Sequence, residues 1–176
     1  MLKSIYITDI AAWCKTDFPD FTATPLCNRS DLYINGMKAT NITIPSEVTS
    51  IGNYAFCGCN SLTSVTISDG VTSIGDNAFD SCSDLVLINI PPSISSIGKD
   101  AFSGCFELKS VYIIDLAAWC SIKYGNASGD DYGLDSNPLC NGADLYINGE
   151  KATHITIPSN VTSIGNCAFF DYSDLE

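Results

Sequence analysis

Residues 64–86, "SVTISDGVTSIGDNAFDSCSDLV", are one unit of a repeat that decides the fold. The unit before it is "NITIPSEVTSIGNYAFCGCNSLT" (41–63), and the unit after it is "LINIPPSISSIGKDAFSGCFELK" (87–109). These three units follow one another at 23-residue spacing, and a fourth, "HITIPSNVTSIGNCAFFDYSDLE", spans 154–176. A fixed period of this size is typical of solenoids, in which each unit is one coil and neighbouring coils share a core.

The start of each unit predicts a short strand. The junctions between units read L-x-x-[IV]-x-I, the strand signature of a leucine-rich repeat. Side chains alternate along a strand, so Val65 and Ile67 are expected in the core and Thr66 outside. The pattern therefore predicts a β-rich solenoid with one strand per coil along one face.

The second half of each unit predicts a corner and a compact turn. Residues 71–74 form a second apolar stretch, and Gly75 suits the tight corner that follows it. Ala78 and Phe79 are expected to form one short helical or 3₁₀ turn packed into the coil, because so short a unit leaves no room for a long helix.

A longer duplication overlays this repeat. Residues 2–14 return as 108–120, and residues 25–56 return as 138–169, with dissimilar joining segments between them. We expect two inserted islands, at about 8–40 and 114–153, each with a short N-capped helix and an Asn-Gly hairpin. Regular 23-residue units then occupy about 41–113 and 154–176, and residues 1–176 form a single solenoid.

Composition excludes several classes of function. The net charge of −12 argues against nucleic acid and against anionic membrane surfaces. The chain has no apolar run near the ~18 residues of a membrane span, so membrane insertion is not expected. The N-terminal residues alternate like a strand, so we expect neither a signal peptide nor an anchor in this chain.

The motifs "VTSIGxxAFxxC" and "ITIPxxVTSIG", with the islands "DLAAWC", "PLC" and "DLYING", resemble the BspA-like leucine-rich repeat proteins. The resemblance covers essentially the whole chain. It implies a right-handed solenoid, an extracellular or cell-surface location, adhesion to protein partners and contact between cells. It brings no catalytic motif and no cofactor.

The nine cysteines leave alternatives open. Cys59, Cys82 and Cys105 recur once in each successive unit, which predicts a stacked ladder of buried thiols, with a disulfide or a metal as alternatives. The pairs Cys14 with Cys27 and Cys120 with Cys140 recur in both islands, and each pair would close a variable loop. These four residues are therefore predicted either to form two disulfides or to be buried thiols.

No residue pattern predicts an enzyme or a metal site. A catalytic cysteine needs a base, and the single histidine, His154, is expected on a solvated face. Asp130, Asp131 and Asp135 cluster in one loop, but their spacing does not match a calcium-binding EF-hand loop. We therefore expect no catalysis, no cofactor and no metal.

The outward strand positions are the candidate binding face. Tyrosine supplies rigid, amphipathic contact area, so this face could bind a protein or a glycan; the alternative is a plain solvated sheet. The candidate residues are Tyr6, Thr43, Thr66, Asn89, Tyr112 and Thr156, with Tyr33 and Tyr146 extending the row.

The two ends of the chain share one phase of the repeat. Leu2 and Leu175 both stand immediately before a strand position, so the last coil of one copy could receive the first strand of another. A contact of that kind does not close into a ring, so it predicts filaments. The alternative is that this chain is a fragment of a longer surface protein. The candidate assembly residues are Leu2, Ile5, Ile7, Phe169 and Leu175.

Overall fold

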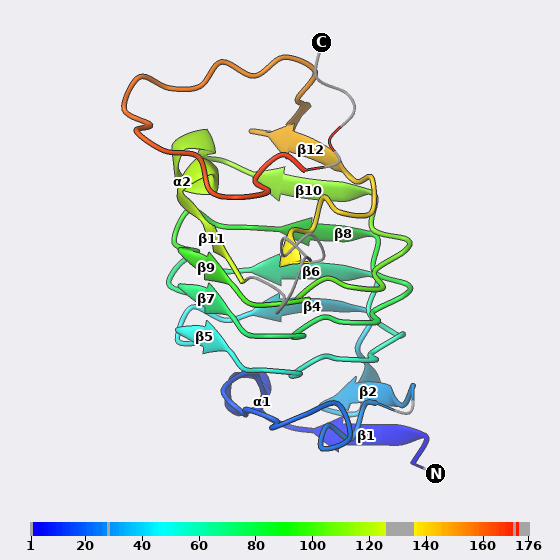
Figure 1. Cartoon of the computed structure of the whole chain (residues 1–176). Helices are drawn as coiled ribbons and strands as arrows, with labels where there is room; N and C mark the ends of the chain where they lie inside the picture. The colour runs from blue at the N-terminus through cyan, green and yellow to red at the C-terminus, as the bar shows by residue number, and fades with distance from the viewer. Residues whose placement is uncertain (1, 28, 126–135, 171, 173–176) are drawn as a thin grey trace.

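The computed structural model describes residues 2–27, 29–125, 136–170 and 172. It is a stack of coils with the ends of the chain at opposite ends of the stack (Figure 1). The solenoid and the 23-residue unit predicted from the sequence are confirmed. Two sheets run along the stack, one on each side of the core.

The larger sheet contains the first strand of each coil. Its order is β13-β12-β10-β8-β6-β4, with parallel neighbours except for the antiparallel pair β12–β13. Its members are β4 (Asn41–Ile44), β6 (Ser64–Ile67), β8 (Leu87–Asn89), β10 (Ser110–Ile113), β12 (Asp144–Ile147) and β13 (Glu150–Lys151). Inward side chains such as Val65 and Ile67 are buried, and Thr66 between them is exposed, as predicted.

The smaller sheet contains the second apolar stretch of each coil. Its strands are very short and run in the order β11-β9-β7-β5. They are β5 (Ser50–Ile51), β7 (Ser73–Ile74), β9 (Ser96–Ile97) and β11 (Lys123–Tyr124). After β5, β7 and β9, the chain makes hydrogen-bonded turns rather than a regular helix; Ala55 N donates to Gly52 O and Cys57 N to Tyr54 O.

The islands carry the expected helix and hairpin, and each also completes a coil. The first contains β1 (Ser4–Ile7), α1 (Ile10–Cys14), β2 (Asp31–Ile34) and β3 (Met37–Lys38). Strand β1 pairs in parallel with β2, so that Ser4 lies opposite Asp31. In the second island Ser110 lies opposite Asp144. Both intervals exceed the regular unit. These longer coils hold α1 and α2 (Leu116–Ser121) after their first strand, and the second of them also keeps a short second strand, β11, after its helix.

The island helices start and pack as their sequences predict. Asp9 accepts from Ala12 N, and Asp115 accepts from Ala117 N and Ala118 N, which satisfies otherwise free helix donors. The tryptophans of these helices also bond to the main chain of a following coil. Trp13 Nε1 donates to Ala55 O at 2.9 Å, and Trp119 Nε1 donates to Ala168 O at 3.0 Å.

Where two regular coils adjoin, a main-chain N–H of the earlier coil donates to the equivalent alanine carbonyl instead. Phe56 N donates to Ala78 O at 2.8 Å, and Phe79 N donates to Ala101 O at 2.9 Å. Where a helix replaces part of the coil, the indole N–H therefore substitutes for the missing main-chain donor.

Each island ends in a hairpin that interrupts the stacking. Asn35 and Gly36 both have positive φ, 51° and 81°, as the tight hairpin turn between β2 and β3 requires. The second hairpin, at Asn148 and Gly149, has the same conformation. Because β3 occupies the edge of β2, no hydrogen bond among the described residues joins the three-stranded sheet β1-β2-β3 to β4.

The core consists of ladders of identical side chains. The rings of Phe56, Phe79 and Phe102 are stacked, with centroids 5.3 and 5.5 Å apart. The predicted thiol ladder lies beside them. Cys82 Sγ donates to Phe56 O at 3.1 Å, and Cys105 Sγ donates to Phe79 O at 3.2 Å. The thiols thus satisfy carbonyl groups of the preceding coil as well as filling space.

The nine cysteines all lie among the described residues and form no disulfide in the structure, including the two pairs for which disulfides were an alternative. Cys14 is the buried last residue of α1, while Cys27 lies against the turn at Gly58 in the next coil. Cys120 is buried at the end of α2, and the half-buried Cys140 lies next to Asn141. Cys14 and Cys120 are thus buried and Cys27 and Cys140 half-buried, and the pairing of these four residues stays a prediction.

The corner glycines are needed because adjacent coils approach closely there. Gly75 does not have a positive φ, so the corner itself does not require glycine. A Cβ at Gly75 would instead lie 2.6 Å from Asn53 Oδ1 and 2.7 Å from Asn53 N. Gly52, Gly98 and Gly125 face the same kind of obstruction from the preceding coil.

Gly75→Ala is expected to lower the free energy of unfolding by about 1–3 kcal/mol, because the methyl group must push two coils apart. Gly36→Ala is the matched control. Its Cβ would meet nothing within 4 Å, and only the φ of +81° would be strained, at a cost of about 1 kcal/mol. Urea unfolding of both variants tests this; equal losses would show that the spacing between coils is adjustable.

The buried thiols predict a loss of stability at alkaline pH. Burial, with Asp9 nearby, raises the pKa of Cys14 from 9.0 to about 12, and burial, with Asp80 nearby, raises that of Cys57 to about 12. Their contribution to stability is complete below about pH 9 and is lost as pH rises through about 12. Between these pH values the two thiols ionise in the unfolded chain but stay protonated in the folded protein, which favours unfolding. The urea midpoint should therefore fall from about pH 9 upward, and Cys57→Ala should reduce that fall. An unchanged pH dependence in the variant would contradict this origin of the alkaline loss.

Candidate functional site

The outward face of the larger sheet brings most of the predicted binding residues into one row. The register aligns Thr43, Thr66, Asn89 and Tyr112, and it adds Tyr146 beyond them. Tyr6 lies on the separate sheet of the first island, opposite Tyr33. Tyr6 is 67% exposed, so its ring is largely available to a partner.

Each island presents the same group of outward side chains. Tyr6 and Tyr33 stack with ring centroids 4.7 Å apart, and Tyr112 and Tyr146 stack at the same distance. Beside each pair lies an ion pair, Lys38 with Asp31 or Lys151 with Asp144, both at 2.9 Å. The outward face therefore consists of two matching tyrosine pairs that flank the threonine strands β4 and β6.

Asn89 lies in the row but is not a free outward group. Its Oδ1 accepts from Ile67 N at 2.6 Å, and its Nδ2 donates to Ile67 O at 3.2 Å. The amide thus replaces main-chain bonds between β6 and β8, which ends β8 one residue early. An asparagine at a position where the other regular units have threonine was the available sequence signal.

The predicted binding residue Thr156 lies outside any strand. Residues 154–157 have no ladder partner, unlike the equivalent strand β4. The β13 hairpin occupies the edge of β12 that such a strand would need. The outward row is therefore continued by Tyr146 of β12 and not by Thr156.

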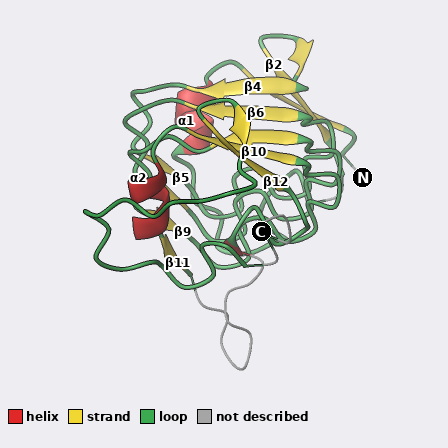
Figure 2. Ribbon diagram, turned by 90° about the horizontal axis from the view of Figure 1, so that it is seen from above, coloured by secondary structure: helices red, strands yellow, loops and turns green. Residues whose placement is uncertain are grey.

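Two grooves open where the larger sheet is interrupted. One of about 330 Å³ lies beside Asn89, between residues 67–69 and 112–114. The other, of about 410 Å³, lies between the β2–β3 hairpin and β4, and Met37 at its margin is 73% exposed. Figure 2 shows this hairpin projecting beyond the stack of parallel strands.

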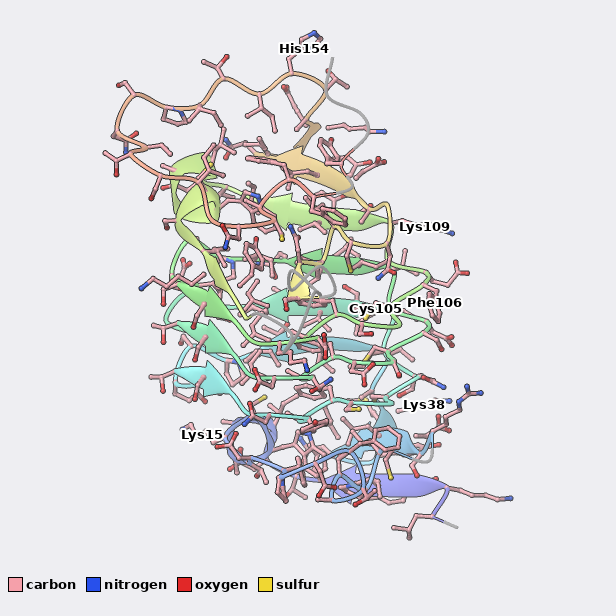
Figure 3. The ribbon with its side chains drawn as sticks, viewed as in Figure 1. Lys15, Lys38, Cys105, Phe106, Lys109 and His154 are labelled. Carbon is pink, nitrogen blue, oxygen red and sulfur yellow. The ribbon has the colours of Figure 1, made fainter. Side chains whose placement is uncertain are left out.

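The described residues contain no cluster of side chains suited to holding a metal ion. No group of three or more His, Cys, Asp or Glu side chains gathers among them. His154 lies exposed at the end of the stack, where Nδ1 is 3.2 Å from Thr153 Oγ1 (Figure 3). Asp130, Asp131 and Asp135, the cluster considered for calcium, lie outside the described residues.

Both ends of the stack leave core positions uncovered. Ile5 and Ile7 are half-buried, whereas their counterparts Val111 and Ile113 are buried. In the last coil Ile157 is 38% exposed and Phe169 is half-buried. Leu2 is exposed, and Leu175 lies outside the described residues. In the part of the chain that the structure describes, no helix is long and apolar enough to cross a membrane.

Among the solved structures compared, one with a TM-score of 0.50 supports the fold. A leucine-rich repeat protein of T. pallidum is 26% identical, with a TM-score of 0.50, over 78% of this chain and 56% of its own. A leucine-rich repeat protein of Bacteroides ovatus is 34% identical, with a TM-score of 0.46, over 71% of this chain and 29% of its own. This chain thus spans only 56% and 29% of their lengths. No curated protein matched it.

The family comparison covers most of the sequence. Six copies of the BspA type leucine-rich repeat region match residues 29–119 and 142–176, which include every regular unit and both hairpins. The chain therefore belongs to the BspA-type leucine-rich repeat proteins.

Proposed function

We propose that this chain is a non-enzymatic binding module that mediates adhesion-type protein contacts at a cell surface. The observation that carries the proposal is the outward face, on which two matching tyrosine pairs flank a threonine-rich sheet. A glycan is the alternative ligand for the same face. The family supports an interaction role, and the outward face supplies the surface for it.

The chemistry of this face suits reversible contact with a protein. Tyrosine rings add amphipathic area at little entropic cost, and stacking holds each pair in place before a partner arrives. The threonines of β4 and β6 add hydroxyl groups without charge. Aromatic anchors of this kind commonly provide most of the binding energy at an interface.

The paired substitution Tyr112→Ser with Tyr146→Ser is expected to weaken capture by an immobilised matrix protein at least about tenfold, because it removes one whole anchor. The measurement is surface plasmon resonance against collagen, fibronectin and laminin, with a glycan array in parallel. Binding to the glycan array but to none of the matrix proteins would show that the ligand is a glycan and not a protein.

The matched control is Phe106→Ser. Phe106 is 76% exposed but projects from the turn before β10, at the side of the stack and away from the outward face (Figure 3). This variant should bind like the unaltered protein. Equal loss in the control and in the paired variant would mean that general surface hydrophobicity, not the tyrosine pair, drives capture.

We propose head-to-tail assembly into filaments as a second candidate function, because partly exposed apolar positions of the core occur at both ends of the stack. The junction between β8 and β10 inside the chain is a template for such a contact. By analogy, Ile5 and Ile7 of one copy would lie opposite Ile155 and Ile157 of another. Burying these side chains supplies a hydrophobic driving force.

Ile5→Asp is expected to abolish any growth in particle mass with protein concentration, because it places a charge in the proposed contact. Light scattering across concentration, with electron microscopy, is the measurement. Ile114→Asp is the control, since Ile114 is 62% exposed and lies away from both ends. Constant monomer mass at every concentration would refute the filament.

A further inference from the structure

We propose that the free edge of β4 is a second binding site, which takes an extended peptide segment of a partner protein as an added strand. This site lies at the interruption of the larger sheet, between β3 and β4. It borders the outward face at Thr43 but uses the main-chain groups at the edge of β4 instead of the tyrosine pairs or the ends of the stack, so it goes beyond the proposed adhesion and assembly.

The hydrogen bonds of β4 show which of its main-chain groups are available. Ser64 N donates to Thr40 O, and Ser68 N donates to Ile44 O, so both carbonyl groups face β6. In a parallel pair, alternate residues direct their main-chain groups to opposite sides. The N–H and C=O groups of Asn41 and Thr43 therefore face away from β6, toward the groove.

The opposite side of the groove does not use these groups. In the described part of the chain no hydrogen bond joins Met37 or Lys38 to β4, and the strands belong to different sheets. Asn41 and Thr43 are both exposed. An open row of main-chain donors and acceptors is what a sheet edge offers to a further strand.

The groove supplies apolar contacts for the side chains of such a strand. Ile10, Ile34 and Ile42 contribute to its lining, and Met37 stands 73% exposed at its margin. Methionine adapts to differently shaped partners because it is unbranched and flexible. The groove's volume of about 410 Å³ lies within the range of about 300–1,000 Å³ typical of binding pockets.

Comparison of the two islands indicates that this groove is specialised. Residues 25–56 and 138–169 differ at six positions, and two of these line the groove. Met37 corresponds to Glu150, and Asn41 corresponds to His154. Among the described residues, the second island also lacks a strand after its hairpin. The apolar margin and the free edge thus occur together in the first island.

The fitting partner is a segment that alternates apolar and outward polar residues, parallel to β4 like the other strands next to regular coils. It would continue an interface that the molecule already uses, because β6 binds β4 in this way. The net charge of −12 favours a neutral or basic segment over an acidic one.

The probe is a labelled synthetic peptide that repeats residues 63–68, TSVTIS, between two pairs of lysines. A scrambled peptide of the same composition controls for charge attraction. Fluorescence anisotropy should show saturable binding of the probe below about 1 mM and much weaker binding of the scrambled peptide. Hydrogen exchange should show slower exchange of the Thr43 amide when the probe is bound.

Two variants test the site. Thr43→Pro removes a donor that faces the groove but not a bond to β6, so it should reduce probe affinity at least about tenfold while the fold is kept. Met37→Glu introduces the side chain of the second island and should also weaken binding. Ile114→Glu, a similarly exposed apolar site outside this groove, should leave binding unchanged.

Three outcomes would overturn the proposal: no saturable binding up to about 1 mM, equal binding of the scrambled peptide, or unchanged affinity in Met37→Glu. The last measurement decides the matter if Thr43→Pro fails to fold, which circular dichroism would show. Loss of matrix-protein capture in the tyrosine variants, with probe binding intact, would separate this site from the outward face.

Discussion

The close approach of each coil to the one before it, at the corner that carries glycine, is the constraint on which the stack depends. The glycine N–H donates to the preceding coil in each case, for example Gly75 N to Ile51 O and Gly98 N to Ile74 O, both at 2.8 Å. A side chain at these positions would meet the main chain of that coil. With this spacing fixed, the strands pair in register and the phenylalanine rings stack 5.3 and 5.5 Å apart.

The islands keep that spacing between coils although their sequences and lengths differ from those of the regular units. Gly52 N donates to Cys14 O at the end of α1, and Gly165 N donates to Cys120 O at the end of α2, both at 2.7 Å. The indole of Trp13 or Trp119 supplies the donor that the helix removes. A longer coil is therefore compatible with the solenoid as long as it presents the same hydrogen-bonding groups to its neighbour.

Most of the architecture follows from sequence periodicity alone. The 23-residue unit predicts the strands with their buried Val65 and Ile67, and the islands predict the helix caps at Asp9 and Asp115 and the hairpin at Asn35, because these depend on local pattern. The features that periodicity did not predict arise from competition between groups on different coils.

The candidate site shows that competition most clearly. Asn89 fits the outward pattern, but its amide bonds to the main chain of Ile67 on the neighbouring strand. Thr156 has the right phase, but a hairpin strand already occupies the adjacent sheet edge. Likewise, the two tyrosine pairs form because β1 pairs with β2 and β10 pairs with β12. These are long-range pairings that no local pattern reveals.

The junction between the first island and the regular coils lacks a strand ladder in the described part of the chain. On the corner side, Gly52 N bonds to Cys14 O, Phe18 N to Asn53 O, and Asn53 N to Asp17 Oδ1. On the sheet side, β3 and β4 share no hydrogen bond among the described residues. The solenoid is therefore mechanically uneven. A bending motion about the glycine corner of this junction would break no strand ladder, whereas the same motion between β4 and β6 would break one.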